Sequence, residues 1–461
     1  MPKKRPIDAI PPVAAPISDP SKTATGEDLI RKNPHFAEPM TSSPDPTKFA
    51  VKHGSDKIAY SILDQMRGKL RPRPFPVVAG VKEPILTLAD SYGHQGAAIV
   101  KQITAAQQIV FHTIGDTGNT RGPKDQSLVA DKMVDDFNEV DPRQVPSFCY
   151  HVGDLVYSFG EAAYYYDQFY EPYRNYPAPI FAVPGNHDGM VAPGSTAVTL
   201  DAFLRNLCAA GKPPHQTEEA GGLSRTAQIQ PGVYFTLEAP FVRILGLYSN
   251  CLEDPGVISS QGGTYPELSD AQLVFLKAAL SRIKAEKYKG AVIIAVHHPP
   301  YVAQLTSPQL DSVSTNNVGR HAGSYEMLQE IDTVCQATGV WPHAFLSGHA
   351  HNYQRFTRYK QGRETPLIVE GNSGHAHNSL TRDRTSAIRV PVDQPTLSDG
   401  NDRVVFDNYD DQDFGYLRVI VNAEQLRIEY HPKSDGADAK TPDDHVTVDL
   451  ATRKIVHFKL K

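Results

Sequence analysis

The chain has 461 residues and a formal net charge of −6, with 46 basic and 52 acidic side chains. This balance argues against a nucleic-acid scaffold, which needs a dense basic face. No segment approaches the ~18 apolar residues of a membrane span, and no apolar signal-peptide region follows the basic start, so we expect a cytoplasmic protein without a membrane partner. The four cysteines are far apart and are expected to be reduced structural thiols.

The first hundred residues divide by composition into two parts. Residues 1–55 are rich in Pro, Ser, Thr and Asp and lack a sustained apolar period, which predicts an extended or disordered arm. Residues 56–104 contain two strand-like runs, 75–79 and 97–100, which predict a leading β segment. This segment is either a small β module or a set of strands packed on the core that follows.

Residues 105–461 are predicted to form one large domain in which strands alternate with helices. This alternation indicates a layered α/β core, and a polar, Gly-rich stretch at 189–232 predicts an insertion beside the active site. Buried strands are expected at 109–114, 148–152, 179–183, 291–296, 344–347 and 366–370, amphipathic helices at 124–140, 269–280 and 323–337, and C-terminal β-hairpins at 415–430 and 446–458.

Polar side chains with metal-binding chemistry follow five of these strands. Four strands end in glycine before a polar residue, and the fifth leads directly into a pair of histidines. Loops at the carboxyl ends of strands are where α/β proteins place their chemistry. The motifs are Gly115-Asp116-Thr117-Gly118, Gly153-Asp154-Leu155-Val156-Tyr157, Gly185-Asn186-His187-Asp188, His297-His298-Pro299-Pro300 and Gly348-His349-Ala350-His351.

Seven side chains of these motifs are candidate metal ligands. Carboxylate, imidazole, amide and phenol donors suit iron, manganese or zinc, and no thiolate is offered. Seven ligands exceed the three or four that one catalytic metal uses, whereas two ions about 3.5–4 Å apart, bridged by a carboxylate, would use them all. The candidates are Asp116, Asp154, Tyr157, Asn186, His297, His349 and His351.

Together these motifs, with the run from Gly348 to Arg355, resemble the calcineurin-like metallophosphoesterase superfamily and, within it, the purple acid phosphatases. Gly118, in place of a second metal-binding histidine, and Tyr157, three residues after Asp154, indicate the latter group. The resemblance covers about residues 109–355. It implies a four-layer α/β/β/α sandwich of two mixed β-sheets flanked by helices, with an N-terminal extension, and makes 105–461 the catalytic domain.

The resemblance also implies a ligand map. Because a phenol loses its proton at neutral pH only to a strong Lewis acid, Tyr157 as a ligand favours Fe(III). If Tyr157 points elsewhere, two divalent ions are expected instead. Asp116, Tyr157 and His351 would hold the Fe(III), Asn186, His297 and His349 would hold a divalent ion (Fe, Zn or Mn), and Asp154 would bridge the two.

The implied reaction is hydrolysis of phosphate monoesters by in-line attack of a metal-bound hydroxide on a small phosphorylated substrate. His187 is expected to contact the phosphate or protonate the leaving group, and Asn186 to lie beside the substrate. His298 and His321 would share proton transfer; the alternative is that they support the ligands from behind or are exposed.

Further polar side chains surround these motifs. Asp188 is expected to orient its neighbours. Tyr353 and Arg355 are expected to line the substrate pocket, with packing and a surface salt bridge as the alternative. His375 and His377 have the spacing of a further metal pair, but a loop role is favoured over a third metal.

Two other functions stay open. The same metal core serves a phosphodiesterase or a nucleotide-hydrolysing enzyme, because the pocket walls select the substrate. A metal-binding or partner-binding module without turnover is the alternative from another class. The complete ligand set argues against it, since a non-catalytic protein can dispense with ligands.

Overall fold

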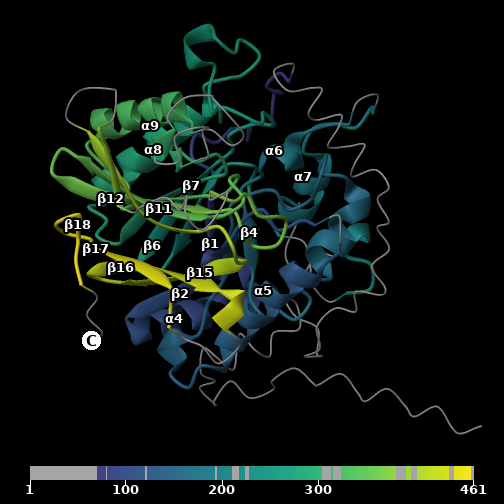
Figure 1. Ribbon diagram of the computed structural model, residues 1–461, viewed down its shortest axis with the longest axis horizontal. Helices are drawn as coiled ribbons and strands as arrows, with labels where there is room; N and C mark the ends of the chain where they lie inside the picture. The colour runs from purple at the N-terminus through teal and green to yellow at the C-terminus, as the bar shows by residue number, and fades with distance from the viewer. Residues whose placement is uncertain are drawn as a thin grey trace, which may run out of the picture.

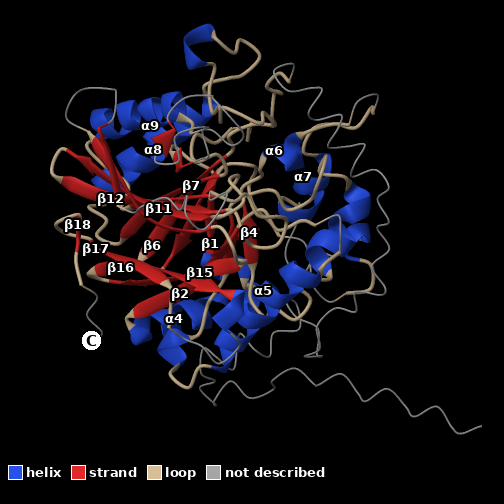
Figure 2. Ribbon diagram, viewed as in Figure 1, coloured by secondary structure: helices blue, strands red, loops and turns tan. Residues whose placement is uncertain are grey.

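The computed structural model describes residues 70–78, 80–119, 122–192, 195–209, 217–223, 228–303, 313–314, 323–380, 391–395, 402–435 and 441–457. The arm predicted at 1–55 lies outside these ranges, as does His321. Figure 1 shows two large sheets facing each other, with helices covering the outer face of each. The predicted four-layer α/β/β/α sandwich is confirmed, and Figure 2 shows its layers by secondary structure.

The first sheet has nine strands, and its centre is parallel. β6, β7, β10 and β12 run in the same direction, and α8 (Ala271–Ala285) and α9 (Tyr325–Thr338) lie beside this sheet in Figure 1. In spatial order its strands are β1 (Ile85–Thr87), β5 (Phe235–Ala239), β6 (Val242–Leu247), β7 (Ala291–Val296), β10 (Ala344–Ser347), β12 (Arg363–Glu370), β11 (Tyr353–Lys360), β14 (Arg403–Asp410) and β13 (Val392–Pro395).

The second sheet has seven strands, of which β2, β3 and β4 are parallel. Its outer face is covered by α4 (Gly96–Ala106) and α5 (Lys124–Asp135) (Figure 1). The two predicted C-terminal hairpins, β15–β16 and β17–β18, are confirmed within it. In spatial order the strands are β18 (Lys454–Ile455), β17 (Asp444–Asp449), β16 (Gln425–Pro432), β15 (Gly415–Asn422), β2 (Gln108–Ile114), β3 (Cys149–His151) and β4 (Ile180–Ala182).

Short elements complete the described chain. They include α3 (Leu88–Ser91), α6 (Asn186–Gly189), α7 (Asp201–Leu207) and the small hairpin of β8 (Val302–Ala303) and β9 (Val313–Ser314). The helices predicted at 124–140, 269–280 and 323–337 correspond to α5, α8 and α9. None of the helices in the described ranges is long and apolar enough to cross a membrane.

The leading segment differs from its prediction. Residues 75–78 form no strand, and residues 97–100 lie within α4, so the two strand assignments are wrong. The apolar run at 97–100 was too short to reveal its period; Ile99 and Ile103, four residues apart, are the buried side of a helix. The strand that this segment does contribute is β1, which pairs with β5 at the edge of the nine-stranded sheet.

Candidate metal centre

All seven candidate ligands are buried and lie just beyond strand ends. The two sheets contribute different atoms. Strands β2, β3 and β4 of the seven-stranded sheet lead to the four oxygen donors, and strands β7 and β10 of the nine-stranded sheet lead to the three histidines. The oxygen donors are Asp116, Asp154, Tyr157 and Asn186, and the nitrogen donors are His297, His349 and His351.

The first group of donors consists of Asp116, Tyr157 and His351. The Tyr157 hydroxyl donates to Asp116 Oδ1 over 3.0 Å and lies 3.3 Å from His351 Nε2. His351 Nε2 is 3.5 Å from the same Asp116 oxygen. Three donor atoms from three separate loops therefore converge, as the ligand map requires of its first site.

The second group is centred on Asn186. Its Oδ1 lies 3.0 Å from His297 Nε2 and 3.0 Å from His349 Nδ1. His297 Nε2 is also 3.4 Å from Asp154 Oδ2. The amide and the two imidazoles thus present their binding atoms to one another, with Asp154 beside them.

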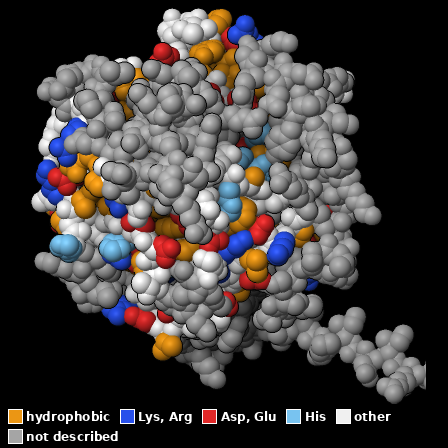
Figure 3. All heavy atoms as spheres, in the orientation of Figure 1, with side chains coloured by type: hydrophobic (Ala, Val, Ile, Leu, Met, Phe, Trp, Pro, Cys, Tyr) orange, Lys and Arg blue, Asp and Glu red, His pale blue; other side chains and the backbone are white. Residues whose placement is uncertain are grey.

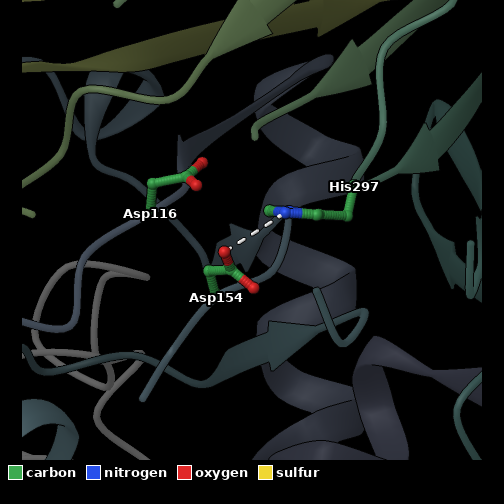
Figure 4. A group of neighbouring side chains, drawn as sticks. All are labelled: Asp116, Asp154 and His297. Atoms are coloured by element: carbon green, nitrogen blue, oxygen red, sulfur yellow. Dashed lines mark ion pairs between the residues drawn. The ribbon is translucent and has the colours of Figure 1, made fainter. Parts of the chain in front are cut away.

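Asp154 lies where the two groups meet. Potential ligand atoms of Asp116, Asp154 and His297 are all within 4.8 Å of one another. Figure 4 shows the Asp154 carboxyl between the other two side chains, with the ion pair to His297 drawn as a dashed line. The three form a possible metal-binding cluster that spans both predicted sites.

The backbone at three candidate ligands adopts an unfavourable conformation. Asp116, Asp154 and His349 have φ angles of 53°, 58° and 70°, in the left-handed region that side chains other than glycine rarely enter. Such conformations cost on the order of 1–3 kcal/mol each and persist where the surroundings enforce them, commonly at functional sites. The chain is therefore bent at these positions to present the side chains.

Two motif glycines are required by close approach. A Cβ on Gly185 would overlap the carboxylate of Asp154, and a Cβ on Gly348 would overlap that of Asp116. Each glycine belongs to a different motif from the carboxylate that it contacts. Glycine at these two positions is thus required by close packing between neighbouring loops, in addition to the turn within each loop.

The electrostatics of the centre favour a cation. Burial lowers the pKa of His297, but the carboxylates of Asp154 and Asp116 outweigh it and raise that pKa to about 9. In the metal-free chain a proton on His297 therefore compensates the buried carboxylates. Carboxylate, imidazole, amide and phenol donors fit a hard or borderline cation, which can take the place of that proton.

Metal affinity is expected to fall as the pH is lowered. His297 must lose its proton before Nε2 can bind a cation, so each pH unit below its raised pKa should cost about tenfold in apparent affinity. Above about pH 9 the affinity should level off. Equilibrium dialysis of Zn²⁺ against the metal-free protein at several pH values measures this slope, and a flat profile would contradict proton competition.

Asp188 holds two of the motif loops together. Its carboxylate accepts hydrogen bonds from the backbone N–H groups of Gly185 (2.8 Å), Asp154 (2.9 Å), Leu155 (3.1 Å) and Val156 (3.2 Å). Burial and the nearby Asp154 charge raise its pKa to about 7, against the opposing effect of these bonds. The side chain orients its neighbours, as expected from the sequence.

The Asp188→Asn variant is expected to lose about 1–3 kcal/mol of unfolding free energy. Both carboxylate oxygens of Asp188 accept hydrogen bonds from backbone N–H groups. The amide NH₂ of an asparagine would replace one of these acceptors with a donor, which would lie against other donors. Asp449→Asn is the matched control, because only Oδ1 of Asp449 accepts its turn hydrogen bonds and an amide oxygen can replace it. Urea denaturation of both variants checks this; equal losses would count against the assigned role of Asp188.

The histidines beside the candidate ligands have distinct surroundings. His187 Nδ1 lies 2.8 Å from the carbonyl of Ser158, and its backbone N–H donates to Asp154 Oδ1. His187 keeps 6 % of its surface exposed. Figure 3 shows one face of the molecule, with the histidine side chains in pale blue. By contrast, both ring nitrogens of His298 are engaged, by Ser249 and by the Leu252 carbonyl, and burial lowers its pKa to about 3.

His298 also lies against a candidate ligand, since its ring centroid is 4.2 Å from that of His349. A neutral imidazole with both nitrogens occupied favours the supporting role over proton transfer. The other residue predicted to share proton transfer, His321, lies outside the described residues.

Tyr353 and Arg355 form contacts with residues that are not candidate ligands. The Tyr353 hydroxyl donates to Asp444 over 2.8 Å, its ring stacks on Tyr430, and Arg355 binds both oxygens of Asp444. These contacts join β11 of one sheet to β17 of the other. These contacts fit the alternative, packing and a salt bridge, and the lining of a substrate pocket stays a prediction.

Two residues near the centre carried no signal in the sequence. Gln168, in the π-helical turn Tyr166–Tyr170, accepts from the Tyr157 N–H over 2.9 Å and donates to its carbonyl over 3.1 Å. Asp254 Oδ1 lies 3.4 Å from His349 Nε2, behind the nitrogen that faces Asn186. Such carboxylates orient histidine ligands, but neither residue belongs to a motif, and Asp254 before a proline signals only a turn.

Close packing around Gln168 also explains why residue 118 is a glycine. A Cβ there would lie 2.5 Å from Gln168 Oε1 and 2.5 Å from the Leu155 carbonyl. A histidine at this position would therefore displace the glutamine that holds Tyr157. This packing accounts for glycine at position 118, because Gly118 and Tyr157 both contact Gln168.

Comparison with known proteins gives a family match and distant structural matches. Residues 110–353 match the family model described as calcineurin-like phosphoesterase, and no curated protein matches the chain. GAP50, the anchor in the inner membrane complex of Plasmodium, is 14 % identical, with a TM-score of 0.47 over 71 % of this chain and 86 % of that chain. PhoD is 13 % identical, with a TM-score of 0.42 over 77 % of this chain and 72 % of that chain.

A third solved structure, a predicted phosphoesterase from Streptococcus pneumoniae, is 10 % identical, with a TM-score of 0.26 over 74 % of this chain and 98 % of that chain. At these identities and TM-scores the solved structures carry no argument about activity. The family model carries more weight, because it spans more than half of the 461 residues and contains all seven candidate ligands. The chain belongs to the calcineurin-like phosphoesterase family.

Proposed function

We propose that this chain is a binuclear-metal phosphomonoesterase of the purple-acid-phosphatase type. The observation that carries the proposal is the division of seven buried donors into two convergent groups with Asp154 between them. The first group would hold Fe(III), and the second a divalent Fe, Zn or Mn ion. In this assignment Asp116, Tyr157 and His351 would hold the first ion, Asn186, His297 and His349 would hold the second, and Asp154 would contact both.

When bound, the two ions would supply Lewis acidity toward the phosphoryl oxygens and lower the pKa of a coordinated water. The protein sets the charge of the site. Ionised Asp116, Asp154 and Tyr157 contribute three negative charges against the five positive charges of a trivalent and a divalent ion. The remaining positive charge favours an anionic substrate, which we propose to be a small phosphorylated molecule rather than a nucleic-acid polymer or a membrane.

His187 is the proposed contact to phosphate or proton donor to the leaving group. A carbonyl oxygen only accepts, so Nδ1 carries the proton shared with Ser158 O and the tautomer is fixed. Nε2 is then the ring atom available for a phosphate oxygen or for a transferable proton. The backbone bond from His187 to Asp154 ties this ring to the proposed bridge.

Two nitrophenyl substrates test the proposal. The protein reconstituted with metal is expected to hydrolyse p-nitrophenyl phosphate at least several-fold faster than bis(p-nitrophenyl) phosphate. The opposite ratio would assign it to the phosphodiesterases of the same family. Reconstituted protein inert on both esters, and on nucleotides, would instead support a metal-binding or partner-binding module without turnover.

A further inference from the structure

The loop after β12 places an imidazole flat against the Tyr157 ring. The ring centroids of His375 and Tyr157 are 3.6 Å apart, and their planes differ by 9°. His375 is 6 % exposed and also makes an edge contact with His351, whose ring centroid lies 4.9 Å away. The imidazole therefore contacts two of the three candidate ligands of the first site.

Several hydrogen bonds fix His375 to the loop that carries Asp116. Its Nδ1 lies 2.6 Å from the Gly118 carbonyl and must donate, since a carbonyl oxygen only accepts. Its backbone N–H donates to the Asp116 carbonyl over 3.0 Å, and the Asn119 side chain donates to its carbonyl over 3.1 Å. The imidazole is thus anchored along its edge and through its backbone.

The neighbouring His377 is placed differently. Its ring packs on Phe414 with centroids 3.8 Å apart, and Lys433 lies over that phenylalanine. The two histidines of this loop therefore contact different residues. His375 lies against the candidate ligands Tyr157 and His351, whereas His377 lies against Phe414. This separation supports the loop role and gives no support to a third metal held by the pair.

We infer that His375 is a positioning residue for Tyr157. At a centroid distance of 3.6 Å the two parallel rings are in direct contact, and neither can tilt without overlapping the other, so the anchored imidazole sets the plane in which the phenol lies. That plane brings the Tyr157 hydroxyl to 3.0 Å from Asp116 Oδ1. The inference rests on the proposed function only where it concerns iron, because the ring contact itself requires no metal.

Two substitutions separate the stack from the hydrogen bond. His375→Asn keeps a side-chain N–H near the Nδ1 position and removes the ring, whereas His375→Phe keeps a ring and removes the donor. His377→Ala is the matched control, two residues along the same loop. Because each variant keeps one of the two anchoring features, at least one is expected to fold normally, which thermal melting of the metal-free protein verifies.

The first measurement needs no metal. With 3-fluorotyrosine incorporated at position 157, the ¹⁹F spectrum of the metal-free protein is expected to show two resonances, one for each orientation of the held ring. His375→Asn should merge or broaden them as the ring begins to flip, while His375→Phe and His377→Ala should retain them. A His375→Asn spectrum identical to that of the parent protein would overturn the inference.

The second measurement uses iron-loaded protein. His375→Asn is expected to shift the phenolate-to-iron absorption band and to weaken iron retention by about tenfold or more, the usual scale for residues that orient ligands. If the ¹⁹F spectrum responds but the parent protein has no Tyr157-dependent band, the positioning role stands and the iron proposal fails. If the band is present and His375→Asn changes neither spectrum, the proposed function stands and this inference fails.

Discussion

Asp154→Ala is expected to abolish phosphoester hydrolysis and to lower the metal content of both proposed sites. Asp154 lies within 4.8 Å of ligand atoms from Asp116 and His297, and its carboxylate is the proposed bridge. Substitutions of residues that merely orient ligands cost about 10–100-fold in affinity or activity, so loss of the bridge should exceed that range. Metal analysis by mass spectrometry and turnover of a nitrophenyl monoester measure both effects.

A matched control separates this effect from the loss of any buried carboxylate. Asp136 is also buried and binds His112 and Tyr416 in the seven-stranded sheet. Asp136→Asn is expected to lower stability while retaining both ions and the activity per folded molecule. Two ions and normal turnover in Asp154→Ala would refute the ligand map.

Tyr157→Phe is expected to remove the visible absorption of the iron-loaded protein entirely. The phenol oxygen is the only part of the side chain that is lost, and the ring can keep its contacts with His375 and His187. Iron retention at the first site should fall by at least about tenfold, because an anionic ligand is missing. Absorption spectra recorded with iron analysis test this directly.

Tyr150→Phe provides the comparison for this second variant. Tyr150 is fully buried on β3, three residues before Gly153, and is not among the proposed ligands. Its substitution should leave the absorption band and the iron content unchanged. If the unsubstituted protein is colourless, free of iron and fully active, the proposal of Fe(III) at the first site is wrong. A second divalent ion would then be the proposed occupant of that site.

The strands, and the positions of the candidate ligands at their ends, were largely predictable because the signal is local. Runs such as 291–296 are apolar at every position, and each ends beside a residue whose chemistry is visible in the sequence. Parallel strands bring their carboxyl ends to one edge, so local motifs suffice to predict convergence. Asp116 and Asp154 could be placed together in this way, because they follow the parallel neighbours β2 and β3. Asp116 and His349, 233 positions apart, follow strands of different sheets, and only the family resemblance predicted that they meet.

Contacts set by side-chain direction across the sheets were not predictable. Arg355 follows the ligand motif closely in sequence, but it points to Asp444 on the opposite sheet. Gln168 forms hydrogen bonds to Tyr157 from 11 residues further along the chain, and His375 stacks on the Tyr157 ring from a distant segment; no spacing rule predicts either contact. The run at 97–100 was misassigned because four apolar residues fit a strand and a helix equally well.

The split of oxygen and nitrogen donors between the two sheets has a consequence for assembly of the fold. Neither layer alone carries a complete set for either ion, since Asp116 and Tyr157 come from one layer and His351 from the other. We therefore expect tight binding of cations only after the two layers have docked. Bound ions would then link one layer to the other. Removal of the ions by a chelator should weaken the contact between the two layers before it unfolds either sheet. Added metal should raise the melting temperature of the protein as the metal concentration increases.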